Sequence, residues 1–120
     1  MNILLVDDDE SIRSPLKEHL EGEGHAVVTA ADGQQAFRML RRGQRPDVIV
    51  LDAMMPVMNG WDFRSAQLSE PEFADIPVVV VSAGGFSNRT VLTQFGVAHY
   101  LPKPLDTEAL LKAITRAATH

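Results

Sequence analysis

Short, unbroken runs of apolar residues recur along the chain, and they constrain its fold more than any other feature of the sequence. The clearest run is Val78-Val79-Val80-Val81, in which apolar and polar residues do not alternate. A strand has this composition when helices cover both faces of its sheet, as in parallel sheets. Strands are therefore predicted at about residues 2–7, 26–30, 47–52, 77–82 and 98–102.

Amphipathic stretches separate these runs, at intervals that suit a repeated strand–helix unit rather than hairpins. Asp9, Asp32 and Asp106 are predicted to cap the first, second and fifth helices. Pro15 lies inside the first stretch, so that helix either starts late or is kinked. The pattern predicts one α/β domain, residues 1–120, with helices at about residues 10–22, 33–42, 60–69, 87–95 and 106–118.

The charge and composition exclude several classes of protein. The chain has 16 acidic and 11 basic residues, a net charge of -5, which argues against direct nucleic-acid binding through charge alone. Four arginines form the nearest thing to a basic patch and are predicted to be a solvated face, namely Arg38, Arg41, Arg42 and Arg45. There is no cysteine, and no apolar run approaches the roughly 20 residues that span a bilayer. A cytoplasmic protein without membrane insertion is predicted.

Polar side chains follow four of the predicted strands at the point where each strand ends. Asp7 and Asp8 follow the first strand, Asp52 closes the third, Ser82 closes the fourth and Lys103 follows the fifth. The carboxyl ends of parallel strands face one crevice, so residues far apart in sequence can meet there. These five residues are therefore predicted to form one site.

The residue types at this site indicate metal and phosphoryl chemistry. Asp7, Asp8 and Asp52 offer the hard oxygen ligands that Mg²⁺ prefers, and a divalent ion relieves the repulsion among clustered carboxylates. A carboxylate can also act as a nucleophile and form an acyl phosphate. Lys103 and Ser82 could neutralise and hydrogen-bond a phosphoryl group, so the set contains the minimum parts for a phosphorylatable aspartate.

Five sequence motifs, taken in order and spacing, make the chain resemble a response-regulator receiver domain over essentially its whole length. They are Val6-Asp7-Asp8, Val50-Leu51-Asp52, the pair Met55-Pro56 with Met58-Asn59-Gly60, Val81-Ser82-Ala83, and Tyr100-Leu101-Pro102-Lys103-Pro104. The resemblance implies a doubly wound, flavodoxin-like fold, with a five-stranded parallel sheet of order 2-1-3-4-5 flanked by five helices.

The resemblance also implies a role for each site residue. Asp52 would accept a phosphoryl group from the phosphohistidine of a histidine kinase or a histidine phosphotransfer protein. Asp8 and Asp52 would bind Mg²⁺ directly, Asp7 through water, and Met54 through its backbone carbonyl. Lys103 would pair with the phosphoryl group and Ser82 would hydrogen-bond it. Tyr100 would change rotamer as the readout, and the Lys103–Pro104 peptide bond would be cis.

The output of such a module is carried by other proteins or domains. The resemblance implies that the surface of the fourth helix, fifth strand and fifth helix binds a separate output protein or a detached output domain. The chain would be a monomer that could dimerise when phosphorylated. It would be no enzyme beyond self-phosphorylation from small donors and autodephosphorylation.

Two other functions stay open at this level. One is a constitutive docking domain that works without phosphate and in which the acidic residues no longer carry out any chemistry. An aspartyl-phosphate phosphohydrolase would use the same nucleophile, although such enzymes generally place an acid–base aspartate two residues later, where this chain has Met54.

Overall fold

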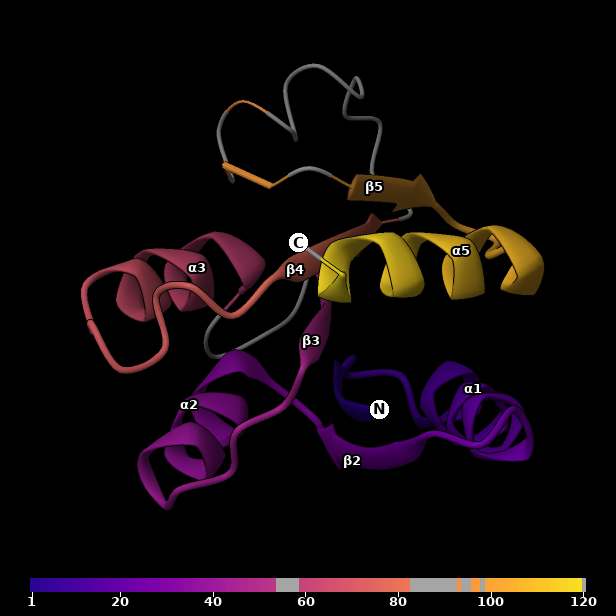
Figure 1. Cartoon of the computed structure of the whole chain (residues 1–120), viewed down its shortest axis with the longest axis horizontal. Coiled ribbons are helices and arrows are strands. Elements are labelled where there is room, and N and C mark those ends of the chain that lie inside the picture. The colour runs from indigo at the N-terminus through magenta and orange to yellow at the C-terminus, as the bar shows by residue number, and fades with distance from the viewer. Residues whose placement is uncertain (54–58, 83–92, 94–95, 98, 120) are drawn as a thin grey trace.

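The molecule is built on a central parallel sheet, drawn in Figure 1. The computed structural model describes residues 1–53, 59–82, 93, 96–97 and 99–119. The strand order is β2-β1-β3-β4-β5 and every neighbouring pair is parallel, which confirms the predicted fold class and order. The strands are β1 (Asn2–Val6), β2 (Ala26–Ala30), β3 (Val48–Asp52), β4 (Val78–Ser82) and β5 (His99–Pro102).

Helices cover both faces of the sheet. In Figure 1, α1 and α5 lie on one side of the sheet and α2 and α3 lie on the other. The helix predicted at residues 87–95 falls outside the described residues apart from position 93. The described helices are α1 (Glu10–Gly22), α2 (Gly33–Arg41), α3 (Gly60–Leu68) and α5 (Thr107–Ala118).

Aspartate side chains fix where three of these helices begin, as the sequence predicts. Asp9 accepts a hydrogen bond from the Ser11 backbone N–H at the start of α1. Asp32 and Asp106 accept equivalent bonds at the starts of α2 and α5. Each carboxylate satisfies a backbone N–H that has no partner within its helix. Because α1 begins at Glu10, Pro15 lies within it, and the alternative of a late start is wrong.

Two apolar cores, one on each face, bury the sheet. The first lies under α2 and α3 and includes Leu51, Phe63 and Val80. The second lies under α1 and α5 and includes Leu20, Val50 and Ile114. All five residues of β3 and all five of β4 are buried, which explains why their sequences show no alternation. The sheet is thus a rigid platform for the side chains at its carboxyl end.

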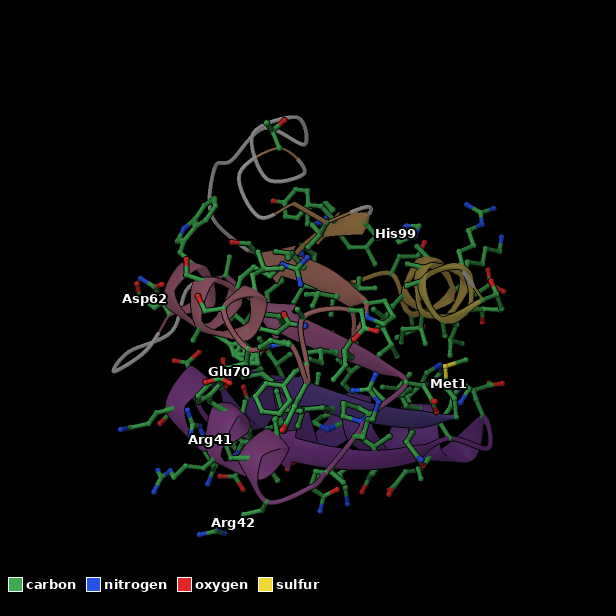
Figure 2. All side chains as sticks on the ribbon, turned by 60° about the vertical axis from the view of Figure 1, so that its left-hand side comes forward. Met1, Arg41, Arg42, Asp62, Glu70 and His99 are labelled. Atoms are coloured by element: carbon green, nitrogen blue, oxygen red, sulfur yellow. The ribbon has the colours of Figure 1, made fainter. Side chains whose placement is uncertain are left out.

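The arginines around the end of α2 join that helix to the segment that follows α3. Arg41 pairs with Glu70 at 2.9 Å, and both are labelled in Figure 2. Arg45 donates to the Glu72 carbonyl at 2.6 Å and lies 3.4 Å from Asp75. These side chains are exposed, as predicted for a solvated face, so each ion pair contributes about 1 kcal/mol or less.

A buried glutamine organises the connection between α3 and β4. Gln67 donates from Nε2 to the carbonyls of Phe73 at 2.9 Å and Ile76 at 3.0 Å. Its Oε1 accepts from Arg64 at 2.8 Å, and Arg64 also donates to the Gly96 carbonyl at 3.0 Å. Burial lowers the pKa of Arg64. This network ties α3 to the segment that precedes β4 and to Gly96, which precedes β5.

None of the helices in the described ranges is long and apolar enough to cross a membrane.

Candidate functional site

Three carboxylates meet at the carboxyl ends of β1 and β3. Asp7 and Asp8 follow β1, and Asp52 is the last residue of β3. One oxygen from each carboxylate lies within 4.8 Å of the others. Asp7 and Asp52 are buried and Asp8 is exposed, so the cluster opens to solvent on the Asp8 side. The structure therefore brings together the acidic residues that the sequence placed at one edge.

Lys103 reaches into this cluster from the end of β5. Its backbone N–H donates to the Ser82 carbonyl at 2.9 Å, which continues the pairing of β4 with β5. Its Nζ donates to Asp7 Oδ2 at 2.9 Å and to Asp52 Oδ2 at 3.3 Å. The lysine side chain is only 12% exposed. Lys103 thus bridges carboxylates from two strands.

The surroundings of Lys103 keep it charged. Burial acts to lower the pKa of Lys103, but the hydrogen bonds and negative charges of Asp7 and Asp52 outweigh burial and raise this pKa above its usual value. The lysine is therefore an ammonium at neutral pH. It balances only one of the three formal negative charges of the cluster, and a divalent cation would neutralise the other two.

Each polar atom of Asp7, in the backbone and in the side chain, has a hydrogen-bond partner. Its N–H donates to the Ala30 carbonyl at 3.1 Å. Its Oδ1 accepts from the Asp9 N–H at 2.9 Å, while Oδ2 accepts from Lys103. Its backbone carbonyl accepts from Nη1 of Arg13 at 2.7 Å. Asp7 is thus a fixed part of the carboxylate cluster.

The start of α3 packs directly on the backbone of the Asp52 segment. Asn59 caps α3 by accepting from the Asp62 N–H at 3.0 Å. The Gly60 N–H donates to the Ala53 carbonyl at 3.1 Å. A Cβ at position 60 would lie 2.8 Å from both the Ala53 Cα and the Asp52 carbonyl oxygen. Gly60 is therefore required by close approach of two backbone segments.

The remaining predicted site residues lie on β4 or β5, directly after β5, or outside the described residues. Ser82 is buried at the end of β4, opposite Pro102 of β5. Tyr100 lies on β5, is half-buried and packs against the first core. The Lys103–Pro104 peptide bond is cis. Met54 falls outside the described residues.

Two contacts of this site were not foreseen from the sequence. The first is the pair between Lys103 and Asp7, because the resemblance assigns Lys103 to the phosphoryl group. The second is Arg13, which contacts the Asp7 carbonyl. The available signal was its position on α1, four residues after the capping Asp9, because helical side chains lean toward the helix N-terminus.

The sequence matches the family described as the response regulator receiver domain over residues 3–115. It is 39% identical over 115 residues to "Response regulator MprA" of Mycobacterium leprae, an alignment that covers 95% of this chain and 49% of that protein. It is 33% identical to "Probable transcriptional regulator ycf27" of Guillardia theta, covering 95% of this chain and 45% of the relative. The chain spans about half the length of the curated relatives it matches.

Solved structures give the same result. A receiver domain of a sensor histidine kinase from Pseudomonas aeruginosa PAO1, with magnesium coordinated in its active-site cleft, superposes with a TM-score of 0.88 at 28% identity, covering 99% of this chain and 98% of that one. Chemotaxis protein CheY4 of Vibrio cholerae superposes with a TM-score of 0.86 at 32% identity, covering 97% of each chain. The chain therefore belongs to the response-regulator receiver-domain family, a regulatory family of two-component signalling rather than a classical enzyme family.

Proposed function

We propose that Asp52 is the phosphoacceptor of this receiver domain, with a histidine kinase or a histidine phosphotransfer protein as the donor. The observation that carries this proposal is the convergence of Asp7, Asp8, Asp52 and Lys103 at one sheet edge. Asp52 is the carboxylate at the end of the central strand β3 and lies 3.3 Å from Lys103. A nucleophile between a cation site and a fixed ammonium suits phosphoryl transfer, which depends mainly on positioning and charge neutralisation.

Mg²⁺ is the proposed cofactor. Asp8 and Asp52 would bind it directly and Asp7 through water, and the proposal extends to the Met54 backbone carbonyl. The fit rests on three hard oxygen donors within 4.8 Å of one another and on an opening to solvent beside Asp8, since Mg²⁺ keeps several waters. When bound, the ion supplies positive charge to the phosphoryl oxygens.

In the proposed transfer, a carboxylate oxygen of Asp52 attacks the phosphorus atom. The phosphorus–nitrogen bond to the donor imidazole breaks, and the nitrogen keeps the electron pair. Lys103 must then move its longer contact, the 3.3 Å one to Asp52, onto a phosphoryl oxygen while it keeps the 2.9 Å contact to Asp7. Ser82, at the end of the neighbouring strand, would donate its hydroxyl to another phosphoryl oxygen.

The phosphoryl group would act as a switch by changing local charge. It adds about -1.5 to -2 charge units at Asp52. Ser82 and Tyr100 would respond, and the surface around β5 and α5 would then favour an output protein or a detached output domain. Complete reversal of a two-state equilibrium requires about 5.5 kcal/mol of differential interaction. We propose that the domain is a cytoplasmic monomer that could dimerise when phosphorylated, and that it does not itself contact nucleic acid.

The decisive experiment is intact mass spectrometry after incubation with acetyl phosphate and Mg²⁺. The wild type should gain one phosphoryl group, and this gain should be absent in Asp52→Asn and in EDTA. Asp62→Asn, which changes an exposed aspartate outside the cluster, should retain the gain.

The other outcomes separate the competing functions. Partner binding that ignores both the phosphodonor and the Asp52→Asn substitution would favour a phosphate-independent docking domain. Release of phosphate from small phosphomonoesters beyond one equivalent would favour a phosphohydrolase. Either result would overturn the proposed switch.

A further inference from the structure

Arg13 holds the backbone of the acidic turn that follows β1. It lies on α1 and is partly buried, and its Nη1 donates to the Asp7 carbonyl at 2.7 Å. This contact reaches back from the end of the first turn of the helix to the residue that follows β1.

The Asp7 carbonyl needs a donor because the chain leaves the sheet at this point. The Asp7 N–H still pairs with β2 through Ala30, but β1 ends at Val6 and its ladder does not continue. A backbone carbonyl without a partner away from water costs free energy. A charged guanidinium satisfies it with one of the stronger kinds of hydrogen bond.

The same contact fixes the direction in which Asp8 leaves the backbone. The Asp7 carbonyl and the Asp8 N–H belong to one planar peptide unit, so anchoring the carbonyl oxygen sets the orientation of that plane. The next residue is anchored too, because the Asp9 N–H donates to Asp7 Oδ1 at 2.9 Å. Lys103 contacts Asp7 and Asp52, whereas Asp8 is exposed, so the position of the Asp8 carboxylate depends on its backbone.

We propose that Arg13 is a positioning residue for the magnesium site, acting through the Asp7–Asp8 peptide plane. The inference rests on the proposed function, which makes Asp8 a direct ligand. Arg13 donates to a backbone carbonyl and touches no phosphoryl oxygen in this role. Loss of Arg13 allows the peptide to rotate and disperses the Asp8 carboxylate over several orientations, so the cation site is no longer preformed.

Removal of Arg13 changes Mg²⁺ affinity in opposite directions according to whether its charge or its positioning of Asp8 dominates. A guanidinium near a cation site repels Mg²⁺, so its removal would tighten binding if only charge mattered. If Arg13 orders Asp8, its removal weakens binding despite the loss of repulsion. Groups that orient metal ligands typically change metal affinity by about 10- to 100-fold when removed, and for an indirect contact through the backbone we expect about tenfold.

The test measures Mg²⁺ affinity by following backbone amide resonances during titration with MgCl₂, without any phosphodonor. Arg13→Met removes the charge and the donors but keeps the aliphatic stem. Arg13→Lys keeps the charge but replaces the planar fork with a point donor. Lys17→Met is the matched control, because it removes a positive charge from the same helix at a residue that pairs with Glu21 at 3.6 Å. Urea unfolding in EDTA records the stability of each variant separately.

Positioning predicts that Mg²⁺ affinity decreases in the order wild type, Arg13→Lys, Arg13→Met, while Lys17→Met binds like the wild type. Equal or tighter binding by Arg13→Met overturns the inference. If Arg13→Met does not fold, Arg13→Lys decides, and affinity equal to the wild type overturns it. If the wild type does not bind Mg²⁺, both the proposed metal site and this inference are wrong. If the wild type binds Mg²⁺ and the Arg13 variants bind it equally well, only this inference is wrong.

Discussion

Replacing Lys103 with methionine should destabilise the domain in EDTA and make Mg²⁺ a much stronger stabiliser of it. Methionine has a similar length, so the change removes the ammonium and leaves most of the packing. Both Asp7 and Asp52 then lose their cation within a site where their side chains are almost fully buried.

The magnitude follows from the two contacts. With an effective dielectric constant of about 20, the pair at 2.9 Å interacts by about 6 kcal/mol and the pair at 3.3 Å by about 5 kcal/mol. Desolvation of the lysine offsets much of this gross attraction, and breaking a buried pair by removing one partner costs about 3–5 kcal/mol. Because Asp8, the third member of the cluster, is exposed to solvent, we expect a loss of about 3 kcal/mol in the free energy of unfolding.

Mg²⁺ should recover most of this loss. A ligand that binds only the folded state stabilises it by about 2.7 kcal/mol when its free concentration is 100 times its dissociation constant. In the proposed metal site, Mg²⁺ and Lys103 would share the Asp52 carboxylate, so the variant should bind Mg²⁺ more tightly than the wild type does. Mg²⁺ should therefore increase the free energy of unfolding more in Lys103→Met than in the wild type at the same concentration.

Urea unfolding followed by circular dichroism, with EDTA and with a series of MgCl₂ concentrations, measures both effects. Lys17→Met is the control, because its exposed pair with Glu21 contributes about 0.5 kcal/mol or less. Stability of Lys103→Met in EDTA within 0.5 kcal/mol of the wild type, or equal stabilisation of both by Mg²⁺, would refute the reasoning.

Three further predictions concern the pH dependence and the packing around the site. The stability contributed by Lys103 should be fully present below its ordinary pKa of 10.5 and lost as the pH rises through its higher pKa in the folded state. The free energy of unfolding in urea should therefore decline at increasingly alkaline pH in the wild type, and Lys103→Met should lack this decline. Gly60→Ala should reduce the free energy of unfolding in urea by about 1–3 kcal/mol, because the new methyl group would meet the backbone of the Asp52 segment. Gly22→Ala, which has open space around it, should have little effect, and equal effects of the two changes would contradict the packing argument. Gln67→Leu should lower the free energy of unfolding by about 2–3 kcal/mol, because two buried carbonyls lose their donor. Thermal and urea unfolding would compare it with Gln34→Leu at an exposed position, and an unchanged stability of Gln67→Leu would show that water replaces the side chain.

The positions of the strands and helices could be predicted because the residues that the fold buries form recognisable patterns in the local sequence. β3 and β4 are buried along their whole length, so their residues form continuous apolar runs, and the predicted bounds are within one residue of the observed ones. The caps Asp9, Asp32 and Asp106 act within three residues of themselves, and such local hydrogen bonds leave a sequence signature. Strand order has no such local signature, and its prediction came from the family resemblance.

The sequence predicts that Asp7, Asp8, Asp52 and Lys103 lie together, but it does not predict which of them contact one another. The ends of apolar runs mark Asp7, Asp52 and Lys103, because parallel strands bring their carboxyl ends together. That Lys103 contacts Asp7 more closely than Asp52 depends on atomic positions across three strands, which no spacing encodes.

The roles of Gln67 and Gly60 could not be predicted, because both depend on contacts with backbone atoms that the local sequence does not specify. Gln67 looks like a surface residue in the sequence, yet it is fully buried because its amide serves carbonyls of the following loop. Gly60 reads as a turn residue, whereas the structure requires it for the approach of α3 to the backbone of Asp52 and Ala53.

The contact between Lys103 and Asp7 joins residues 96 positions apart, and this separation has a consequence for folding. Contacts between distant residues carry a large loop-closure entropy and form slowly compared with local helical turns. During synthesis, Asp7, Asp8 and Asp52 emerge well before Lys103. A partly folded chain in which β5 and α5 have not docked therefore contains the whole acidic cluster but lacks its counter-charge. Under the proposed function, the domain would therefore become competent for phosphoryl transfer only after β5 has docked and placed Lys103 beside Asp7 and Asp52.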